Sequence, residues 1–171
     1  MVYRIPAVNL VGRGCLAQLK DEIGTLGCKK ALVVSDKFLT ENGVVEKVTK
    51  VLDQVGIEHT LYNDVKQNPS VANVEGGLEV LKKENCDFIV SIGGGSPQDC
   101  GKAISVLATN GGKITDYEGV NKSQKKCLPI VAIATTAGTS AEVTINYVIT
   151  DEETHIKMIM VDRNTLASIT V

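Results

Sequence analysis

The sequence has few aromatic residues and almost no excess of charge of either sign. Tryptophan is absent, and aromatic residues make up 4% of the 171 positions. A platform that stacks nucleic-acid bases is therefore not expected. The formal net charge of −2 provides no general attraction to nucleic acid or to an anionic membrane. These features predict a protein with no nucleic-acid partner.

Long apolar runs are also absent. No stretch approaches the roughly 18 apolar residues that a membrane-spanning helix requires. Residues 1–10 lack the basic segment and the long apolar core of a signal peptide. We therefore expect no membrane partner and a cytoplasmic location.

Residue types that bind metals are few and scattered. The two histidines, His59 and His155, are far apart in sequence, and the five cysteines include no Cys-x-x-Cys pair. Because zinc-type sites bring three or four such ligands together, we expect no metal site built from this chain alone. The odd number of cysteines favours free thiols in a reducing compartment over a disulfide framework.

The sequence does contain a regular alternation of strand-like and helix-like segments. Apolar runs rich in β-branched residues predict buried strands, and apolar residues at helical spacing follow them. Strands are expected at 29–36, 57–65, 86–93, 128–134 and 167–171, and helices at 39–56, 68–86 and 96–112. This alternation predicts an α/β fold with an open, Rossmann-like, mostly parallel sheet flanked by helices.

Two segments depart from the alternation. Residues 7–27 contain a turn at 12–14 and then an amphipathic helix, which fits an extra N-terminal strand or hairpin. Residues 143–161 form two extended runs around an acidic turn, which predicts a β-hairpin. No repeat, low-complexity tract or linker interrupts the chain, so residues 1–171 are expected to form a single domain.

A run of three glycines, residues 93–95, follows the third of these strands. Ser96 is the expected N-cap of the next helix, with Pro97 at its first position and Asp99 at its third, as in a variant of the capping box. The free N–H groups at such a helix start favour an anion such as a pyrophosphate. A well-capped turn without a ligand is the alternative. The pattern is neither G-x-G-x-x-G nor a Walker A sequence.

Other polar positions near strand ends also have two interpretations each. Asp36 ends the first strand of the alternation, where a carboxylate can accept both hydroxyls of an adenosine ribose and favour NAD over NADP, or can cap the next turn. The four hydroxyl groups in residues 134–142 can bind a phosphate or ribose, or can cap a short helix. Lys157 can meet a ligand oxygen or remain in solvent.

The motifs together resemble those of the iron-dependent (group III) alcohol dehydrogenases. The matching stretches are "VSDK" at 34–37, "NPS" at 68–70, "IGGGSPQDCGKAI" at 92–104 and "ATTAGTSAEVT" at 134–144. They occur in the order and at the spacing of the family, and the resemblance covers the whole chain. It implies that residues 1–171 are the NAD-binding N-terminal domain.

The resemblance also implies roles for individual residues. Gly94, Gly95 and Ser96 match the residues under the NAD pyrophosphate, Asp99 matches the acid of that motif, and Asp36 matches the residue that holds the adenosine ribose. Thr135, Thr136 and Thr139 belong to residues 134–142, which we call the hydroxyl loop, and match residues near the adenine and phosphates. Asn68, Val148 and Lys157 match positions near the nicotinamide half, and Asn146 matches a position facing the substrate pocket.

The activity implied for a full-length family member is hydride transfer between NAD(H) and a small alcohol or aldehyde. Residues 139–153 are most similar to the branch that interconverts lactaldehyde and 1,2-propanediol, and glycerol or butanol dehydrogenases are the alternative within the family. The family's iron(II) ligands lie in a helical C-terminal domain that we expect to be absent from this chain, which is then inactive by itself. A free-standing, non-catalytic nucleotide-binding module is the alternative outside the family. Family members associate, so a homodimer paired through the edge near residues 2–11 is expected.

Overall fold

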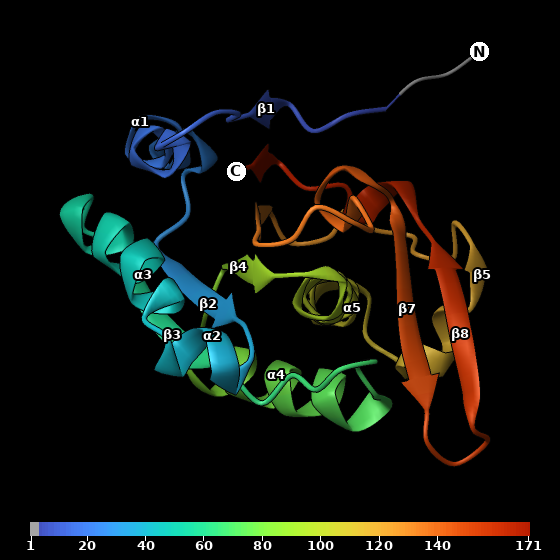
Figure 1. The fold of residues 1–171 in the computed structure, drawn as a ribbon. Coiled ribbons are helices and arrows are strands. Elements are labelled where there is room, and N and C mark those ends of the chain that lie inside the picture. The colour runs from blue at the N-terminus through green and yellow to red at the C-terminus, as the bar shows by residue number, and fades with distance from the viewer. Residues whose placement is uncertain (1–3) are drawn as a thin grey trace.

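A computed structural model describes residues 4–171, and its centre is a six-stranded parallel sheet (Figure 1). The strands are β1 (Val8–Asn9), β2 (Lys30–Val34), β3 (Glu58–Tyr62), β4 (Phe88–Gly93), β6 (Ile130–Ala134) and β9 (Ile169–Thr170). Their order across the sheet is β1-β9-β6-β4-β2-β3, and every neighbouring pair is parallel. The predicted α/β fold is confirmed.

The N-terminal strand lies at one edge of this sheet. Within the described residues β1 pairs only with β9, in parallel, so the segment is an extra strand and not a hairpin. The Thr170 hydroxyl donates to Asn9 Oδ1 at 2.9 Å, and the Leu10 N–H donates to the Thr170 carbonyl at 2.8 Å. Residues 2 and 3 of the expected pairing edge lie outside the described residues.

Helices cover both faces of the sheet. They are α1 (Leu19–Ile23), α2 (Lys37–Glu41), α3 (Val44–Gln54), α4 (Val71–Lys83) and α5 (Gly95–Asn110). Along β2, Ala31 and Val33 belong to the core shared with α1 and α3, whereas Leu32 and Val34 belong to the core shared with α4 and α5. The strand is therefore buried on both sides, as its continuous apolar run predicts.

Two of the predicted helices are interrupted. The expected helix at 39–56 is divided into α2 and α3, because Gly43 adopts a left-handed conformation with φ +72° between them. In the N-terminal segment, α1 is only one turn long and is flanked by 3₁₀ turns at Cys15–Gln18 and Gly24–Leu26. By contrast, α4 begins at the predicted cap, where the Ser70 and Asn73 side chains form a capping box.

A small second sheet packs on the opposite side of α5 from β4 (Figure 1). It contains the predicted hairpin, formed by β7 (Asn146–Asp151) and β8 (Ile156–Val161) in antiparallel register. The short strand β5 (Gly119–Val120), which the sequence did not predict, joins β8 in parallel. Helix α5 therefore lies between the main sheet and the hairpin.

The strand order places a crevice between the carboxyl ends of β2 and β4. From β2 the chain moves outward to β3 and then returns through α4 to β4 on the other side of β2. Ligands of open α/β sheets bind where the order reverses in this way. Asp36 follows β2 and the glycine turn follows β4, so both lie at this point. Among the described residues, none of the helices combines the length and apolar character needed to cross a membrane.

Candidate functional site

The glycine turn begins α5 earlier than the sequence predicts. Gly94 is the N-cap, in an extended conformation, and Gly95 is the first helical residue. Ser96 is therefore the second helical residue and not the cap, and Pro97 is the third. Proline is compatible with this position because the first N–H groups of a helix have no partner within it. No side chain caps this helix start.

Glycine is required in this turn for steric reasons. Gly93 has φ +149°, and a Cβ there would lie 2.5 Å from Pro97 Cγ. A Cβ on Gly94 would lie 3.0 Å from Thr136 Oγ1, and one on Gly95 would lie 3.1 Å from Thr139 Cγ2. The hydroxyl loop thus packs against the turn, and only the absence of Cβ atoms allows Thr136 and Thr139 to approach the main chain of Gly94 and Gly95 so closely.

A buried glutamine holds the turn against the sheet. Gln98 is 2% exposed, and its Nε2 donates to the carbonyls of Ile133, at 3.0 Å, and of Ser91, at 3.3 Å. The Ser91 hydroxyl donates in return to Gln98 Oε1. These bonds connect α5 to β4 and β6. Sequence reasoning did not identify Gln98, since a glutamine in a first helical turn is not distinctive.

A pocket of about 320 Å³ lies over the turn. We call it the turn pocket, and its lining residues are Asp36, Phe38, Val65, Lys66, Gln67 and residues 94–97. It brings together the predicted ribose and pyrophosphate residues from two different strand ends. The uncapped start of α5 faces a space where an anion would meet free N–H groups and the positive end of the helix dipole.

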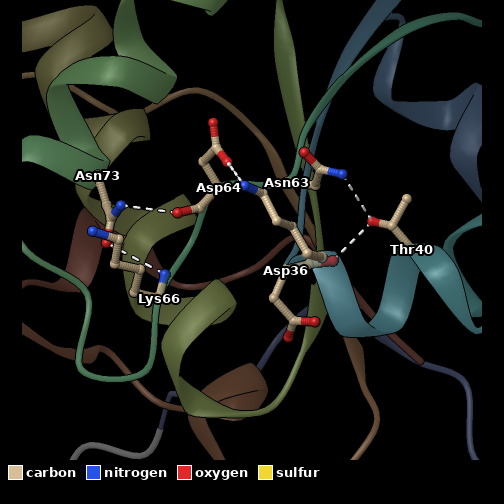
Figure 2. A network of polar contacts seen from close by, with 7 residues as sticks. Asp36, Thr40, Asn63, Asp64, Lys66 and Asn73 are labelled. Carbon is tan, nitrogen blue, oxygen red and sulfur yellow. Dashed lines mark hydrogen bonds and ion pairs between the residues drawn. The ribbon is translucent and has the colours of Figure 1, made fainter.

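Asp36 also fills the capping role that was its alternative interpretation. Its Oδ1 accepts from the Leu39 N–H at 2.8 Å at the start of α2. Figure 2 shows its main chain linked to Thr40, whose hydroxyl donates to the Asp36 carbonyl at 2.8 Å and accepts from Asn63 Nδ2 at 3.3 Å. Among the described residues Oδ2 accepts no hydrogen bond, so the capped carboxylate keeps an oxygen for a ligand.

A second pocket, of about 170 Å³, lies between the same turn and the hairpin. This hairpin pocket shares Gly95 and Ser96 with the turn pocket, and its other lining residues are Asn68, Pro69, Asp99, Thr139, Val148, Thr150 and Lys157. Lys157 Nζ donates to Asn68 Oδ1 at 2.9 Å. Residues 68, 99, 139, 148 and 157, which are remote in sequence, therefore lie around one space.

Asp99 joins α5 to the hairpin instead of closing a capping box. Its Oδ2 accepts from the Val148 N–H at 3.0 Å, because the earlier helix start moves it beyond the N-terminal turn. Burial raises the pKa of Asp99 to about 6, although the Val148 N–H and the nearby Lys102 favour the carboxylate. Asp99 thus lies beside the glycine turn and lines the hairpin pocket, but the capping role that the sequence suggested for it is wrong.

Lys102 makes the second connection and was not predicted. It is 1% exposed, and its ammonium donates at 2.6, 2.8 and 2.7 Å to the carbonyls of Ala141, Thr144 and Asn146. All three N–H groups of the ammonium therefore have an acceptor. Burial lowers the pKa of Lys102 to about 8, opposed by Asp99 and Glu142. A lysine one turn after Asp99 gave no signal that it would be buried.

The threonines of the hydroxyl loop lie around two different pockets. Thr139 lines the hairpin pocket and Thr136 approaches Gly94. Thr135 and Thr136 also line a separate pocket of about 440 Å³ at the ends of β1, β6 and β9. Thr135, Thr136 and Thr139 are all exposed. The 3₁₀ turn at Ala141–Val143 shows that this loop does lead into a short helical turn, although Ser140 does not cap it with its side chain.

Residues for an iron site are not assembled in this structure. Within residues 4–171, no group of three or more histidine, cysteine, aspartate or glutamate side chains could hold a metal ion. All five cysteines are free thiols, as predicted. The described residues therefore do not form a metal site by themselves.

Sequence comparison matches residues 6–171 to a family model described as iron-containing alcohol dehydrogenase. Alcohol dehydrogenase 4 of Schizosaccharomyces pombe is 50% identical over 99% of this chain and 40% of that protein. The NAD-dependent methanol dehydrogenase of Bacillus methanolicus is 41% identical over 99% of this chain and 44% of that protein. Lactaldehyde reductase of Escherichia coli is 46% identical over 88% of this chain and 40% of that protein.

Structure comparison gives the same result. The crystal structure of a 1,3-propanediol oxidoreductase superimposes with a TM-score of 0.96 at 41% identity, covering 99% of this chain and 44% of that one. The chain therefore spans less than half the length of the relatives that it matches.

Proposed function

Because this chain belongs to the iron-containing alcohol dehydrogenase family, we propose that it is the part of such an enzyme that binds NAD(H). The observation that carries this proposal is the glycine turn. It lies at the reversal of strand order, begins α5 without a side-chain cap, and has no Cβ atoms over the helix start. An extended dinucleotide also needs two connected spaces, and the turn and hairpin pockets share Gly95 and Ser96.

In this proposal the turn pocket receives the adenosine ribose and the pyrophosphate. Gly94, Gly95 and Ser96 bring main-chain N–H groups to the phosphate oxygens at the positive end of α5. Asp36 offers Oδ2 to the ribose hydroxyls while Oδ1 continues to cap α2. A 2′-phosphate would meet the carboxylate charge, so NAD is preferred to NADP.

The hairpin pocket receives the nicotinamide half. Bound NAD would supply the hydride acceptor and NADH the donor. Asn68, Val148 and Lys157 line the space for the nicotinamide ribose and ring. Asp99 accepts from the Val148 N–H and so fixes the separation between α5 and the hairpin on either side of this space. Asn146 is exposed at the start of β7, where it faces the substrate side in this proposal.

The hydroxyl loop completes the cofactor site. Thr136 and Thr139 lie over Gly94 and Gly95, where their hydroxyls can donate to phosphate oxygens. Thr135 lies further along, at the ends of β6 and β9, on the side that we assign to the adenine. These roles follow from position beside the turn and from the resemblance of residues 134–144 to the family's loop.

For the full-length protein we propose interconversion of lactaldehyde and 1,2-propanediol. The identity to lactaldehyde reductase and the match of residues 139–153 to that branch support this substrate. Iron(II) and most of the substrate pocket would come from outside this chain, in a C-terminal helical domain. We therefore expect NAD binding without appreciable turnover from residues 1–171. Coding sequence that continues past Val171 into a helical domain would exclude a free-standing module.

Titration calorimetry with NAD⁺ and NADP⁺ tests the central proposal. We expect the chain to bind NAD⁺ more tightly, and Gly95→Ala to weaken that binding by at least about tenfold, since the new methyl group would lie 3.1 Å from Thr139 Cγ2 and push the hydroxyl loop away from the turn. Gly24→Ala is the matched control, because a Cβ there meets nothing within 4 Å. No NAD⁺ binding by the unsubstituted chain, or equal effects of the two substitutions, would refute the proposal.

Two further parts of the proposal concern the whole protein. We propose a cytoplasmic homodimer in which β1, the edge strand of the sheet, pairs with its counterpart in a second copy. Sedimentation of the full-length protein with and without Asn9→Pro measures this, because the N–H groups of Val8 and Leu10 donate to the β9 side and that of Asn9 faces the open edge. A monomer before substitution would contradict it.

A further inference from the structure

A third pocket adjoins the proposed ribose site on the side away from the glycine turn. It has a volume of about 500 Å³ and is lined by Lys37, Asn63, Asp64, Val65, Lys66 and Asn73. Val65 and Lys66 also line the turn pocket. The space beside Asp36 therefore continues into a second space whose walls carry two lysines and one carboxylate.

One of these lysines is held by the carboxylate. Lys37 Nζ lies 3.0 Å from Asp64 Oδ1, and the two side chains are 70% and 62% exposed. Lys37 directly follows Asp36 in the chain, yet the ion pair draws its ammonium toward Asp64. In Figure 2 the carboxylates of Asp36 and Asp64 point away from each other, and it is the Asp64 carboxylate that pairs with Lys37.

The position of Asp64 is fixed by the loop that carries it. The Asp64 carbonyl accepts from Asn73 Nδ2 at 3.0 Å, and the Lys66 N–H donates to Asn73 Oδ1 at 3.3 Å. Asn73 is 6% exposed, and its own carbonyl accepts from the Tyr62 hydroxyl at 2.8 Å. Hydrogen bonds to Asn73 thus fix the main chain at residues 64–66 (Figure 2). The exposed side chains of Lys37 and Asp64 can still rearrange.

This arrangement bears on which dinucleotide can bind. A 2′-phosphate on the adenosine ribose would lie next to Asp36 and in reach of cations on the same wall, and phosphates pair readily with lysine. In the structure Asp36 would repel that phosphate, and Asp64 pairs with Lys37, an exposed cation of the adjoining pocket. Without both carboxylates, Lys37 and Lys66 would leave the two adjoining pockets with an unopposed positive charge.

We propose that Asp64 is a second determinant of cofactor specificity, which favours NAD over NADP by holding Lys37 away from the 2′ position; this rests on the proposed function of the turn pocket. Asp36 acts directly on the ribose side, whereas Asp64 acts through Lys37. Replacing Asp36 alone removes a repulsion but supplies no attraction. Replacing Asp64 as well releases the lysine to the phosphate.

The experiment compares dissociation constants for NAD⁺ and NADP⁺ by calorimetry in four variants and the unsubstituted chain. They are Asp36→Gly, Asp64→Asn, the Asp36→Gly/Asp64→Asn pair, and that pair with Lys37→Met. We expect the pair to bind NADP⁺ about tenfold more tightly than Asp36→Gly does, and Lys37→Met to abolish the gain. All three positions have side chains outside the core, so folding is checked simply by far-UV circular dichroism.

The matched control releases a different lysine. Glu46 pairs with Lys50 on α3 at 2.7 Å, with similarly exposed side chains, so Glu46→Gln in the Asp36→Gly background should leave the NADP⁺ constant unchanged. The inference is overturned if Asp64→Asn adds nothing to Asp36→Gly, if the gain persists without Lys37, or if Glu46→Gln produces the same gain. If the unsubstituted chain binds neither dinucleotide, the proposed function itself fails, and the inference fails with it.

Discussion

The two pockets on either side of the glycine turn are built in different ways. The hairpin pocket is held by polar groups that are withdrawn from solvent: the half-buried Asp99 accepts from the Val148 N–H, and the buried Lys102 donates to three carbonyls of residues 141–146. The turn pocket is lined by Asp36, and the third pocket, which adjoins it, is lined by the Lys37–Asp64 ion pair, whose side chains are largely in solvent.

This contrast indicates that one pocket contributes to the stability of the fold and the other determines which ligand binds. Buried polar groups are costly when a partner is removed, so changes around the hairpin pocket should reduce the free energy of unfolding. Exposed ion pairs contribute little to stability, so changes beside the turn pocket can alter charge without altering the fold. Four measurements test this contrast.

The largest effect is expected at Lys102. Lys102→Ala leaves the carbonyls of Ala141, Thr144 and Asn146 without their buried donor and should lower the free energy of unfolding by about 3 kcal/mol. Urea denaturation measures this. Lys47→Ala, at an exposed position in the middle of α3, is the control and should change stability by less than about 0.5 kcal/mol. Equal effects would show that the buried bonds do not stabilise the hairpin.

Asp99 should make stability depend on pH. Its pKa is about 6 in the folded chain and ordinarily 3.8, so the folded state binds the proton more tightly. The free energy of unfolding should therefore fall as the pH rises from about 4 to about 6, by about 2 kcal/mol after partial solvent screening. The difference between the unsubstituted chain and Asp99→Asn isolates this contribution, because other carboxylates cancel. A difference that is constant from pH 4 to pH 7 contradicts the assignment.

Substitutions of Asp36 should separate its capping role from its charge. Asp36→Ala removes the cap of α2, which accepts from the Leu39 N–H, and should cost about 1 kcal/mol. Asp36→Asn keeps a capping oxygen and should leave stability nearly unchanged while weakening NAD⁺ binding. Thermal denaturation and calorimetry on the same samples measure both quantities. Parallel losses of stability and affinity in Asp36→Asn would mean that the carboxylate serves only the helix.

The smallest effect is expected from the Lys37–Asp64 pair. Asp64→Asn and Lys37→Met should each change the free energy of unfolding by less than about 0.5 kcal/mol, because both side chains are exposed. Chemical denaturation at low and high salt measures this, and the small difference should decrease further with salt. A loss as large as that of Lys102→Ala would remove the contrast between the two pockets.

Much of the main sheet could be predicted from the sequence because its signals are local. Runs such as residues 31–34 and 88–93 are almost entirely apolar and are buried on both faces, and Ser70 has the side chain that a helix cap needs. The glycine turn was located for the same reason. The break between α2 and α3 was missed, since Gly43 lies within an otherwise continuous helical pattern.

The partners of Asp99 and Lys102 could not be predicted in this way. Both bond to the main chain of residues 141–148, about 40 to 50 positions later, and main-chain groups leave no trace in a sequence pattern. The capping-box spacing of Ser96 and Asp99 suggested a local partner instead. The true helix start at Gly95 emerged only from the packing of residues 93–97 against the hydroxyl loop.

The parallel pairing of β1 with β9 has a consequence for how the chain folds during synthesis. Asn9 and Thr170, which meet through their side chains, are 161 positions apart, and among the described residues β1 has no other partner strand. At ribosomal rates of about 5 to 20 residues per second, β1 waits for roughly 8 to 30 seconds before β9 exists. During that interval its unpaired edge is accessible to chaperones and to neighbouring nascent chains.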